Sequence, residues 1–249
     1  MRIGCAGWSI PPRYAARFPR AGSTLERYAQ VFDSVEVNSS FHRPHRPDTW
    51  RRWAQSVPPH FRFSVKMPRA ISHDARLRGC GPLLDDFLAQ VLELGASLGC
   101  LLLQLPPSLE YDAPVVSRFF AMMRRRYDGP LVCEPRHRSW FARSVARALA
   151  RRRVGIVAAD PARVPRAAIP AGDRTVEYAR LHGSPRMYYD AYPDAAIERI
   201  ARRLARASRA TRERWVIFDN TTLGHATADA LRLRERLARD AKRPRARAR

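Results

Sequence analysis

Several short apolar runs of the sequence end in charged and polar residues, at the positions where strands would end. Glu134 and Arg136 close the run PLVCEPR, and alternation along a strand places both on one face. Lys66 lies at the end of FRFSVKM, and Arg180 and His182 lie at the end of VEYARLHG. Carboxylates and imidazoles can transfer protons, whereas lysine and arginine stabilise negative charge. These residue types predict acid–base and electrostatic catalysis on an anionic substrate.

Lysine is rare in this chain, which makes Lys66 a candidate catalytic residue. Of 46 lysines and arginines, only Lys66 and Lys242 are lysines. Lysine can titrate and can form a Schiff base, which arginine cannot, although chance retention is the alternative explanation.

Two enzyme classes are compatible with these residues. The first is a hydrolase-type enzyme for a phosphate ester or phosphodiester, with Glu134 as general base or acid and His182 assisting. The second is a lyase or isomerase for a small carbonyl compound, in which Lys66 forms an imine or stabilises an enolate. A non-catalytic nucleic-acid-binding barrel is the remaining alternative.

Other strand ends supply further polar side chains, and alternation predicts which of them share a face. On the eighth run, Phe218 and Asn220 share one face. A structural ion pair is the alternative for any single residue, but burying so many polar groups is costly unless they are paired. The predicted catalytic residues are Glu134, Lys66 and His182, and the predicted substrate-binding residues are Glu36, Asn38, Gln104, Arg136, Arg180, Asn220, Trp8 and Tyr188.

A divalent metal would suit these residues, but nothing in the sequence requires one, and the cofactor stays unknown. Carboxylates and imidazoles are suitable ligands, yet their spacing in sequence cannot show a site. If a metal binds, the predicted ligands are Glu36, Glu134, Asp160 and His182.

The last two strand ends carry small and hydroxyl residues, in LHGSP (181–185) and DNTTLGHAT (219–227). Loop amides and a helix N-terminus in this position predict a phosphate-binding corner. Capping of the last helix by Thr222 or Thr227 is the alternative.

Eight apolar runs alternate with helical patterns along the chain, which predicts an α/β fold, a single-domain TIM-like (β/α)8 barrel. A doubly wound sheet is the main rival, but no GxGxxG follows the first run. The barrel should span residues 1–238, with a basic, disordered tail over 239–249 and a loop with at most one helical turn over 161–172. The predicted strands lie within 2–8, 34–41, 61–67, 99–106, 130–136, 154–160, 176–183 and 214–220.

The formal charge of +23 predicts an anionic partner, either a small molecule or nucleic acid. A basic background that keeps the protein soluble is the alternative. No apolar run is long enough for a membrane span, and no signal layout precedes the first strand, so a cytoplasmic location is expected. The four scattered cysteines are expected to be reduced and mostly buried, and no protein partner can be inferred.

In order along the chain occur GCAGWS, VEVNSSFHR, the lysine of FSVKM, ISH, LLQLPP, EPRHRSWF, YARLHG and FDNTTLGHA. This combination closely resembles the YecE-like family, called domain of unknown function seventy-two. The resemblance implies a TIM-like barrel without an established biochemical function, and an analogy with endonuclease-type metal barrels suggests nucleic-acid binding. It departs at His42, where the family usually has tyrosine, and at Asp219, where it usually has asparagine. The implied pocket residues are Glu36, Asn38, Lys66, Gln104, Glu134, Arg136, His137, His182 and Asn220.

Overall fold

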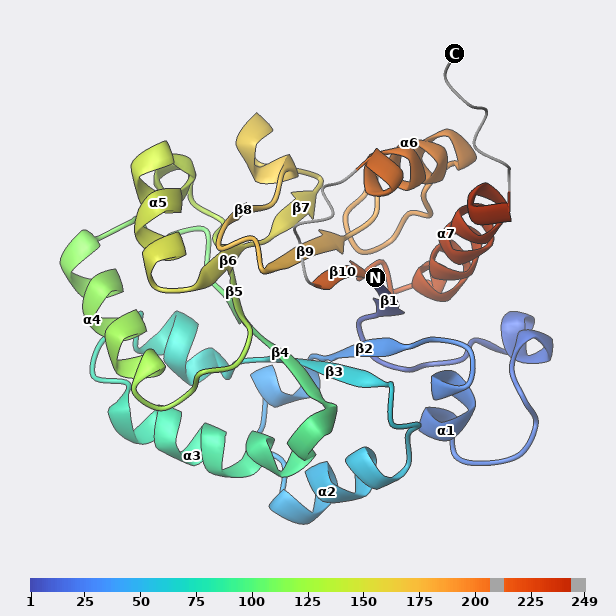
Figure 1. The fold of residues 1–249 in the computed structure, drawn as a ribbon, viewed down its shortest axis with the longest axis horizontal. Coiled ribbons are helices and arrows are strands. Elements are labelled where there is room, and N and C mark those ends of the chain that lie inside the picture. The colour runs from blue at the N-terminus through green and yellow to red at the C-terminus, as the bar shows by residue number, and fades with distance from the viewer. Residues whose placement is uncertain (207–212, 243–249) are drawn as a thin grey trace.

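The computed structural model describes residues 1–206 and 213–242, in which strands and helices alternate along the chain (Figure 1). The strands are β1 (Arg2–Cys5), β2 (Ser34–Val37), β3 (Arg62–Lys66), β4 (Leu98–Gln104), β5 (Leu131–Glu134), β6 (Val154–Ile156), β7 (Ala158–Asp160), β8 (Ala171–Gly172), β9 (Val176–Leu181) and β10 (Glu213–Phe218). The α-helices are α1 (Thr24–Ala29), α2 (Pro47–Gln55), α3 (Gly81–Val91), α4 (Ala113–Arg124), α5 (Arg143–Arg151), α6 (Asp194–Arg206) and α7 (His225–Lys242). Short helices are η1 (Pro12–Arg17), η2 (Ser39–Phe41), the π-helix η3 (Ala70–Asp74), η4 (Leu92–Ser97), η5 (Arg138–Phe141) and η6 (Pro165–Ala168).

The strands pair into two sheets, and all pairings are parallel except that of β6 with β8. One sheet has the order β1-β10-β9-β7 and the other β2-β3-β4-β5-β6-β8. The predicted α/β class with parallel strands is therefore confirmed. Within the described residues, however, the ladders form two sheets and not the single closed sheet of the predicted barrel. The sheets adjoin where Val157 separates β6 from β7, and where one parallel bridge joins Ala6 to Glu36.

All eight predicted strand regions contain a strand, and the sixth is divided into β6 and β7. The segment predicted as a loop over 161–172 holds the short helix η6 and ends in β8, whose two residues pair antiparallel with β6. Helix α7 continues to Lys242, four positions into the predicted basic tail, and residues 243–249 lie outside the described part of the chain. No helix among the described residues is long and apolar enough to span a membrane.

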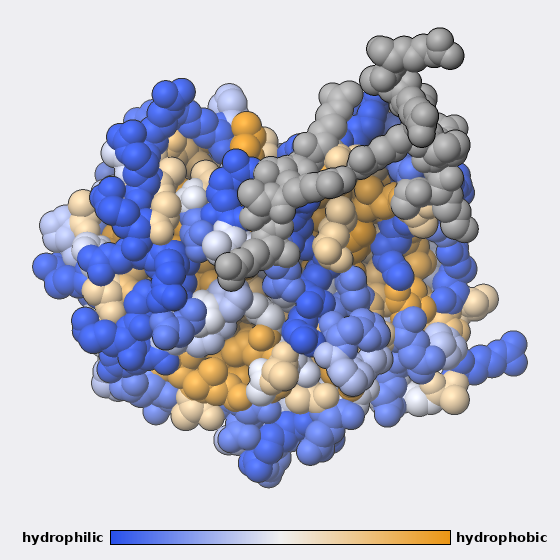
Figure 2. Space-filling model, in the orientation of Figure 1, coloured by the Kyte–Doolittle hydropathy of each residue, from blue (hydrophilic) through white to orange (hydrophobic). Residues whose placement is uncertain are grey.

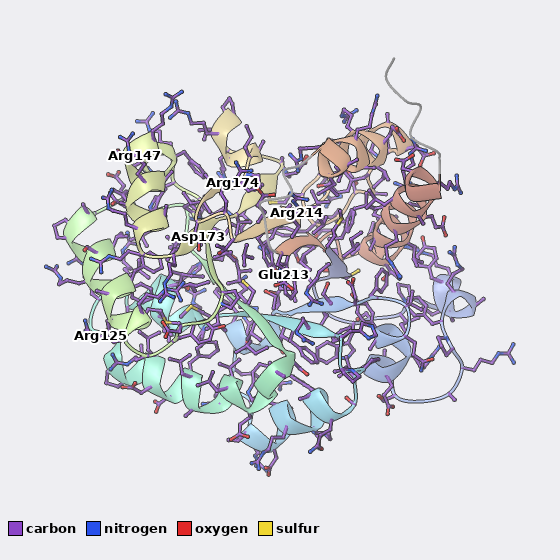
Figure 3. All side chains as sticks on the ribbon, in the orientation of Figure 1. Arg125, Arg147, Asp173, Arg174, Glu213 and Arg214 are labelled. Atoms are coloured by element: carbon purple, nitrogen blue, oxygen red, sulfur yellow. The ribbon has the colours of Figure 1, made fainter. Side chains whose placement is uncertain are left out.

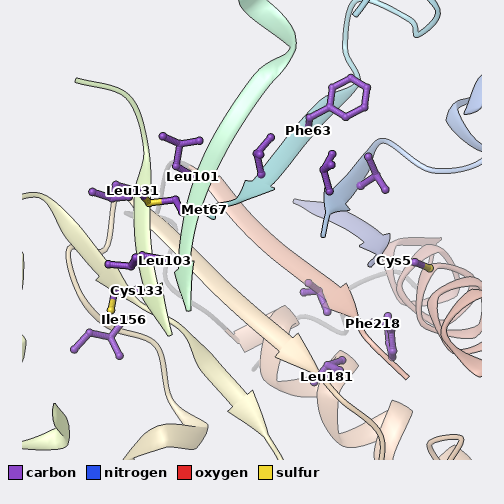
Figure 4. Close-up of a cluster of buried hydrophobic side chains, with 14 of the residues drawn as sticks. Cys5, Phe63, Met67, Leu101, Leu103, Leu131, Cys133, Ile156, Leu181 and Phe218 are labelled. Atoms are coloured by element: carbon purple, nitrogen blue, oxygen red, sulfur yellow. The ribbon is translucent and has the colours of Figure 1, made fainter. Parts of the chain in front are cut away.

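Strand alternation divides the apolar side chains between two cores. Leu101 and Leu103 of β4 point outward into the large core between the strands and the helices, together with Leu131 and Cys133 of β5 (Figure 4). The alternate residues of β4, β5, β9 and β10 meet in a second, interior core. Since β4 and β5 belong to one sheet and β9 and β10 to the other, the inner faces of the two sheets share one interior. This interior core consists of Cys100, Leu102, Val132, Val157, Val176, Tyr178, Trp215 and Ile217.

The α-helices lie around the outside of the strands (Figure 1), with mostly hydrophilic side chains on the visible surface (Figure 2). Local sequence fixes where several of them begin. A capping box of Ser23 and Glu26 starts α1, and the Asp112 side chain caps α4 by accepting a hydrogen bond from the Val115 amide. Because parallel strands joined by such helices run in one direction, their carboxyl ends gather at one end of the interior.

Candidate functional site

Arg180 is the centre of a buried polar cluster at the carboxyl ends of the strands. It is only 1% exposed, and its guanidinium group contacts three carboxylates from three other strands or strand ends. Nε and Nη2 donate to the two oxygens of Glu36 at 3.0 and 2.7 Å, which is a bidentate pair. Nη1 donates to Glu134 Oε2 at 2.6 Å, and Nη2 also donates to Asp219 Oδ2 at 2.8 Å. Arg180 thus joins the two sheets through charged hydrogen bonds.

These carboxylates and the guanidinium group stabilise each other's charge. Burial by itself would lower the pKa of Arg180, but the charges of Glu134 and Glu36 outweigh it and hold that pKa well above its usual value. Burial would likewise raise the pKa of Glu134, yet the charges of Arg180 and Arg136 hold it well below its usual value. The same balance lowers the pKa of Asp219, mainly through Arg180 and a hydrogen bond with His182. Glu134 and Asp219 are therefore permanent negative charges at neutral pH.

His182 extends the cluster toward Arg136. Its Nδ1 lies 3.0 Å from Asp219 Oδ2, and its Nε2 lies 2.9 Å from Arg136 Nη2 and 3.0 Å from Glu134 Oε1. Arginine can only donate, so the tautomer with its proton on Nδ1 donates to Asp219 and accepts from Arg136. Arg136 Nη2 then bridges His182 and Glu134, since it also lies 2.7 Å from Glu134 Oε1.

A polar layer beneath Arg180 connects the cluster to the interior core. The Tyr178 hydroxyl donates to Glu36 Oε2 at 2.8 Å and lies 2.9 Å from Ser64 Oγ. Tyr178 stacks on Trp215, and both rings belong to the interior core. Glu36 is consequently held from below by a hydroxyl and from above by Arg180. This arrangement gives the cluster a rigid floor.

Lys66 differs from every other cation in the cluster. No carboxylate of the described residues lies within ion-pair distance of its Nζ, which sits 4.0 Å from the centroid of the Phe41 ring. Burial lowers the pKa of Lys66 to about 8, and the charge of Arg180 acts in the same direction. The side chain is 9% exposed, so it retains contact with solvent. Lys66 can therefore gain or lose a proton near neutral pH.

Two buried polar atoms beside the cluster have no hydrogen-bond partner within the described residues. They are Arg136 Nε, a donor, and Asn38 Oδ1, an acceptor. Unsatisfied buried groups of this kind are uncommon and costly in proteins. Both residues follow strands whose carboxyl ends form the cluster, so a bound ligand or water at this end of the interior would satisfy them.

The structure brings most of the predicted site residues together. Glu36, Lys66, Glu134, Arg136, Arg180 and His182 lie in or directly beside the cluster. Tyr188 packs its ring edge-on to His182 at 5.5 Å and is 39% exposed, which places it over the cluster. Gln104 is paired in register with Glu134 and is partly exposed.

Three predicted residues make side-chain contacts with residues outside the cluster. Asp160 is hydrogen-bonded to the Tyr192 hydroxyl, and Trp8 packs against Trp53. Asn220 faces away from the interior and donates to the Asp190 carbonyl at 2.9 Å and to Asp229 at 2.8 Å.

Asp219 takes the inner position that alternation had predicted for Asn220. Ile217 points into the interior core, so Asp219 shares its face and Phe218 points outward. Tyr178 was also absent from the predicted site. Its parity with Arg180, two residues later, is the signal in the sequence that could have identified it.

The described residues contain no group of three or more His, Cys, Asp or Glu side chains that could hold a metal ion. Arg180 explains this for the predicted ligands, because its guanidinium group lies between Glu36 and Glu134 and binds both. Asp160, the remaining predicted carboxylate, is bonded elsewhere. The residues present do not fit the predicted metal site.

Several amides of the predicted phosphate-binding corner are already bonded within the protein. The Gly183 amide donates to the Tyr192 hydroxyl, and the Thr222 amide donates to the Tyr188 carbonyl. The amides of Gly224 and Ala226 donate to the carbonyls of residues 221 and 220. These four amides are therefore not available to a phosphate.

Comparisons with known proteins agree on one family. The family described as "Protein of unknown function DUF72" matches residues 2–249. The curated protein "UPF0759 protein YecE" from two Escherichia coli strains is 33% identical over 143 residues, which are 57% of this chain and 50% of the relative. The matched region thus spans about half the length of these curated relatives.

Two solved structures share the fold. A DUF72 family protein of Enterococcus faecalis superimposes with a TM-score of 0.79 at 20% identity, covering 95% of each chain. A DUF72 family protein of Thermotoga maritima gives 0.78 at 21% identity, covering 95% of this chain and 98% of the other. At these identities the likeness shows the fold alone.

Proposed function

This chain belongs to the DUF72 family of proteins of unknown function, and we propose that it is an enzyme acting on an anionic substrate, with Lys66 as the proton-transferring residue. The site would lie at the carboxyl ends of the strands, where the two sheets together act as a TIM-like barrel. The observation that carries the proposal is the unpaired, buried ammonium group of Lys66, whose pKa of about 8 suits acid–base catalysis.

The position of one cation in the cluster supports an anionic substrate. Arg180 and Arg136 contact the three carboxylates Glu36, Glu134 and Asp219 directly, whereas Lys66 has no ion-pair partner in the described chain. A substrate anion would supply the missing partner. It would also accept from Arg136 Nε, which has no acceptor among the described residues.

The substrate class that we favour is a phosphate ester or phosphodiester. A phosphoryl group offers enough acceptor oxygens for both Lys66 and Arg136, and arginine binds such groups well. Lys66 in its protonated form would neutralise developing charge or protonate a leaving group. In its neutral form it would accept a proton from an attacking water or hydroxyl.

We assign a positioning role to Glu134, in place of the general acid or base role predicted from the sequence. Each of its oxygens already accepts charged hydrogen bonds, at 2.7 Å from Arg136 and 2.6 Å from Arg180. Its lowered pKa makes it a weak base. Glu134 would instead hold Arg136 and His182 in place around the substrate.

The Lys66 amine is also compatible with a second function. A buried lysine with a lowered pKa can attack a carbonyl group and form an imine, which is the first step of several lyases and isomerases. Borohydride reduction in the presence of small aldehydes and keto acids distinguishes this candidate. It predicts a reduced adduct on Lys66 by mass spectrometry, with Lys242 as the internal control.

The test of the main proposal compares wild type with Lys66→Arg on a panel of phosphate mono- and diesters. Arginine keeps the positive charge but cannot release its proton, so turnover should fall by about 10²-fold or more. Reductive methylation with ¹³C labels the only two lysines, and NMR titration should give a Lys66 pKa near 8 that rises when inorganic phosphate binds. Full activity in Lys66→Arg, or no turnover together with a phosphate-insensitive pKa, would refute the proposal.

A further inference from the structure

A cavity with several arginines in its lining lies between α6 and the strands β9 and β10. Its volume is about 490 Å³, within the range of small-molecule sites. The lining residues of β9 and β10 precede Arg180, His182 and Asp219, which the candidate site uses at the carboxyl ends of these strands. The cavity is therefore distinct from the candidate functional site, although Tyr178 of the polar layer beneath Arg180 also lines it.

Positive charge dominates the walls of this cavity. Among the described residues, five arginines and one carboxylate, Glu177, line the cavity. The arginines are Arg174, Arg199, Arg202, Arg203 and Arg214. Arg174 and Arg214, both labelled in Figure 3, share Glu177 through contacts of 2.6 and 2.9 Å.

The three arginines of α6 retain much of their donor capacity. Arg203 Nη1 donates to the Ala168 carbonyl at 2.9 Å, and Arg202 Nε forms an ion pair with Glu198 Oε1 at 3.6 Å. Arg199 is exposed and makes no ion pair with the described part of the chain. Residues three and four apart share one helix face, so Arg199, Arg202 and Arg203 present their guanidinium groups on the same side of α6.

The remaining walls are apolar. Pro170, Ala179 and Leu204 line the cavity, and Ile169 is 62% exposed although it is a large hydrophobic residue. Guanidinium groups form bidentate hydrogen bonds with phosphates and stack on planar rings. Apolar walls and a volume of about 490 Å³ suit a compact ligand with a ring better than a long strand.

We propose that this cavity binds a small phosphorylated ligand with an aromatic body, of the nucleoside diphosphate class. The phosphates would be held by Arg199, Arg202 and Arg203, and the ring would lie against Pro170 and Leu204. The proposal is independent of the function proposed for Lys66. Nucleotides at the end of a single-stranded oligonucleotide share this chemistry and are the alternative source.

Calorimetric titration with adenosine diphosphate at about 0.1 M NaCl tests the proposal. Wild type should bind the diphosphate, while adenosine should bind at least tenfold more weakly because it lacks phosphates. Arg199→Gln should weaken binding about tenfold, the effect of losing one charge-assisted hydrogen bond. Arg147→Gln is the matched control, since Arg147 is exposed and lies between Arg143 and Arg151 on α5, away from the cavity (Figure 3).

Each other outcome overturns the proposal. Equal weakening by Arg147→Gln would mean that general positive charge attracts the ligand. Unchanged binding in Arg199→Gln would place the ligand elsewhere. If a single-stranded oligonucleotide of about 12 nucleotides binds and adenosine diphosphate does not, the ligand is nucleic acid and not a small molecule. If neither binds, the cavity does not bind phosphorylated ligands of this kind.

Discussion

Arginine serves opposite purposes in two regions of this protein. In the cluster around Arg180, guanidinium groups are buried and contact carboxylates from several strands. In the cavity beside α6, arginines outnumber carboxylates and are mostly exposed. Desolvation explains the difference, because a buried charge without a partner is costly whereas an exposed one remains hydrated. The buried arginines of the cluster therefore depend on carboxylate partners, whereas the exposed arginines beside α6 do not.

The largest expected effect is that of Arg180→Ala. It would leave Glu36, Glu134 and Asp219 without their common partner in the interior. Breaking a buried ion pair costs about 3–5 kcal/mol, so the free energy of unfolding should fall by about 4 kcal/mol. Urea denaturation measures this free energy. Arg199→Gln is the exposed control and should change the free energy of unfolding by no more than about 0.5 kcal/mol.

Arg180→Lys sharpens this comparison. It keeps the charge but loses the bidentate contact with Glu36, so its stability should lie between that of wild type and Arg180→Ala. If Arg180→Ala lowers the free energy of unfolding by less than about 1 kcal/mol, the cluster does not hold the two sheets together. The arginines of the cluster would then not differ in their effect on stability from those of the cavity.

Glu134→Gln should have the next largest effect. Its loss leaves Arg136 and Arg180 each short of one carboxylate contact, which should cost about 2 kcal/mol at pH 7. The pKa of Glu134 is lowered in the folded state, so its stabilisation is complete above its ordinary pKa of 4.5 and is lost as pH falls through the folded value. The free energy of unfolding should thus fall less steeply below pH 4.5 in Glu134→Gln than in wild type.

Glu110→Gln provides the matched control for this prediction. The Glu110 side chain is 77% exposed and its pairing with His137, at 3.7 Å, is loose. Denaturation from pH 7 to pH 2 should give parallel curves for Glu110→Gln and wild type. Parallel curves for Glu134→Gln as well would show that Glu134 is not the ionised centre of the cluster.

Local patterns predict the inner-facing pairs, whereas contacts between distant strands decide how these residues are used. Glu134 with Arg136 and Arg180 with His182 follow from alternation along one strand. The contact between Arg180 and Glu36 cannot be predicted from alternation, because the two residues are 144 positions apart and meet across the interior. The sequence therefore left open whether these carboxylates are free or paired, and the structure has an internally paired cluster.

The register of single strands was equally hard to predict. Whether Asp219 or Asn220 points inward depends on where Ile217 enters the interior core, which packing against Tyr178 and Trp215 determines. The division into two sheets depends on the pairing at Ala6 and Val157, single positions that carry no distinct signal in the sequence. Periodicity cannot report either of these non-local features.

The smallest expected effect is a gain in stability, and it concerns an arginine of the cavity. Arg199 lies three and four positions before Arg202 and Arg203 on α6, and like charges at these spacings destabilise a helix by about 0.2–0.5 kcal/mol each. Arg199→Gln should therefore raise the free energy of unfolding by about 0.5 kcal/mol in low salt. Because the Debye length is only about 3 Å in 1 M salt, the gain should vanish there. Urea denaturation at both salt concentrations measures the change, and a loss of stability in low salt would show that Arg199 supports the fold as Arg180 does.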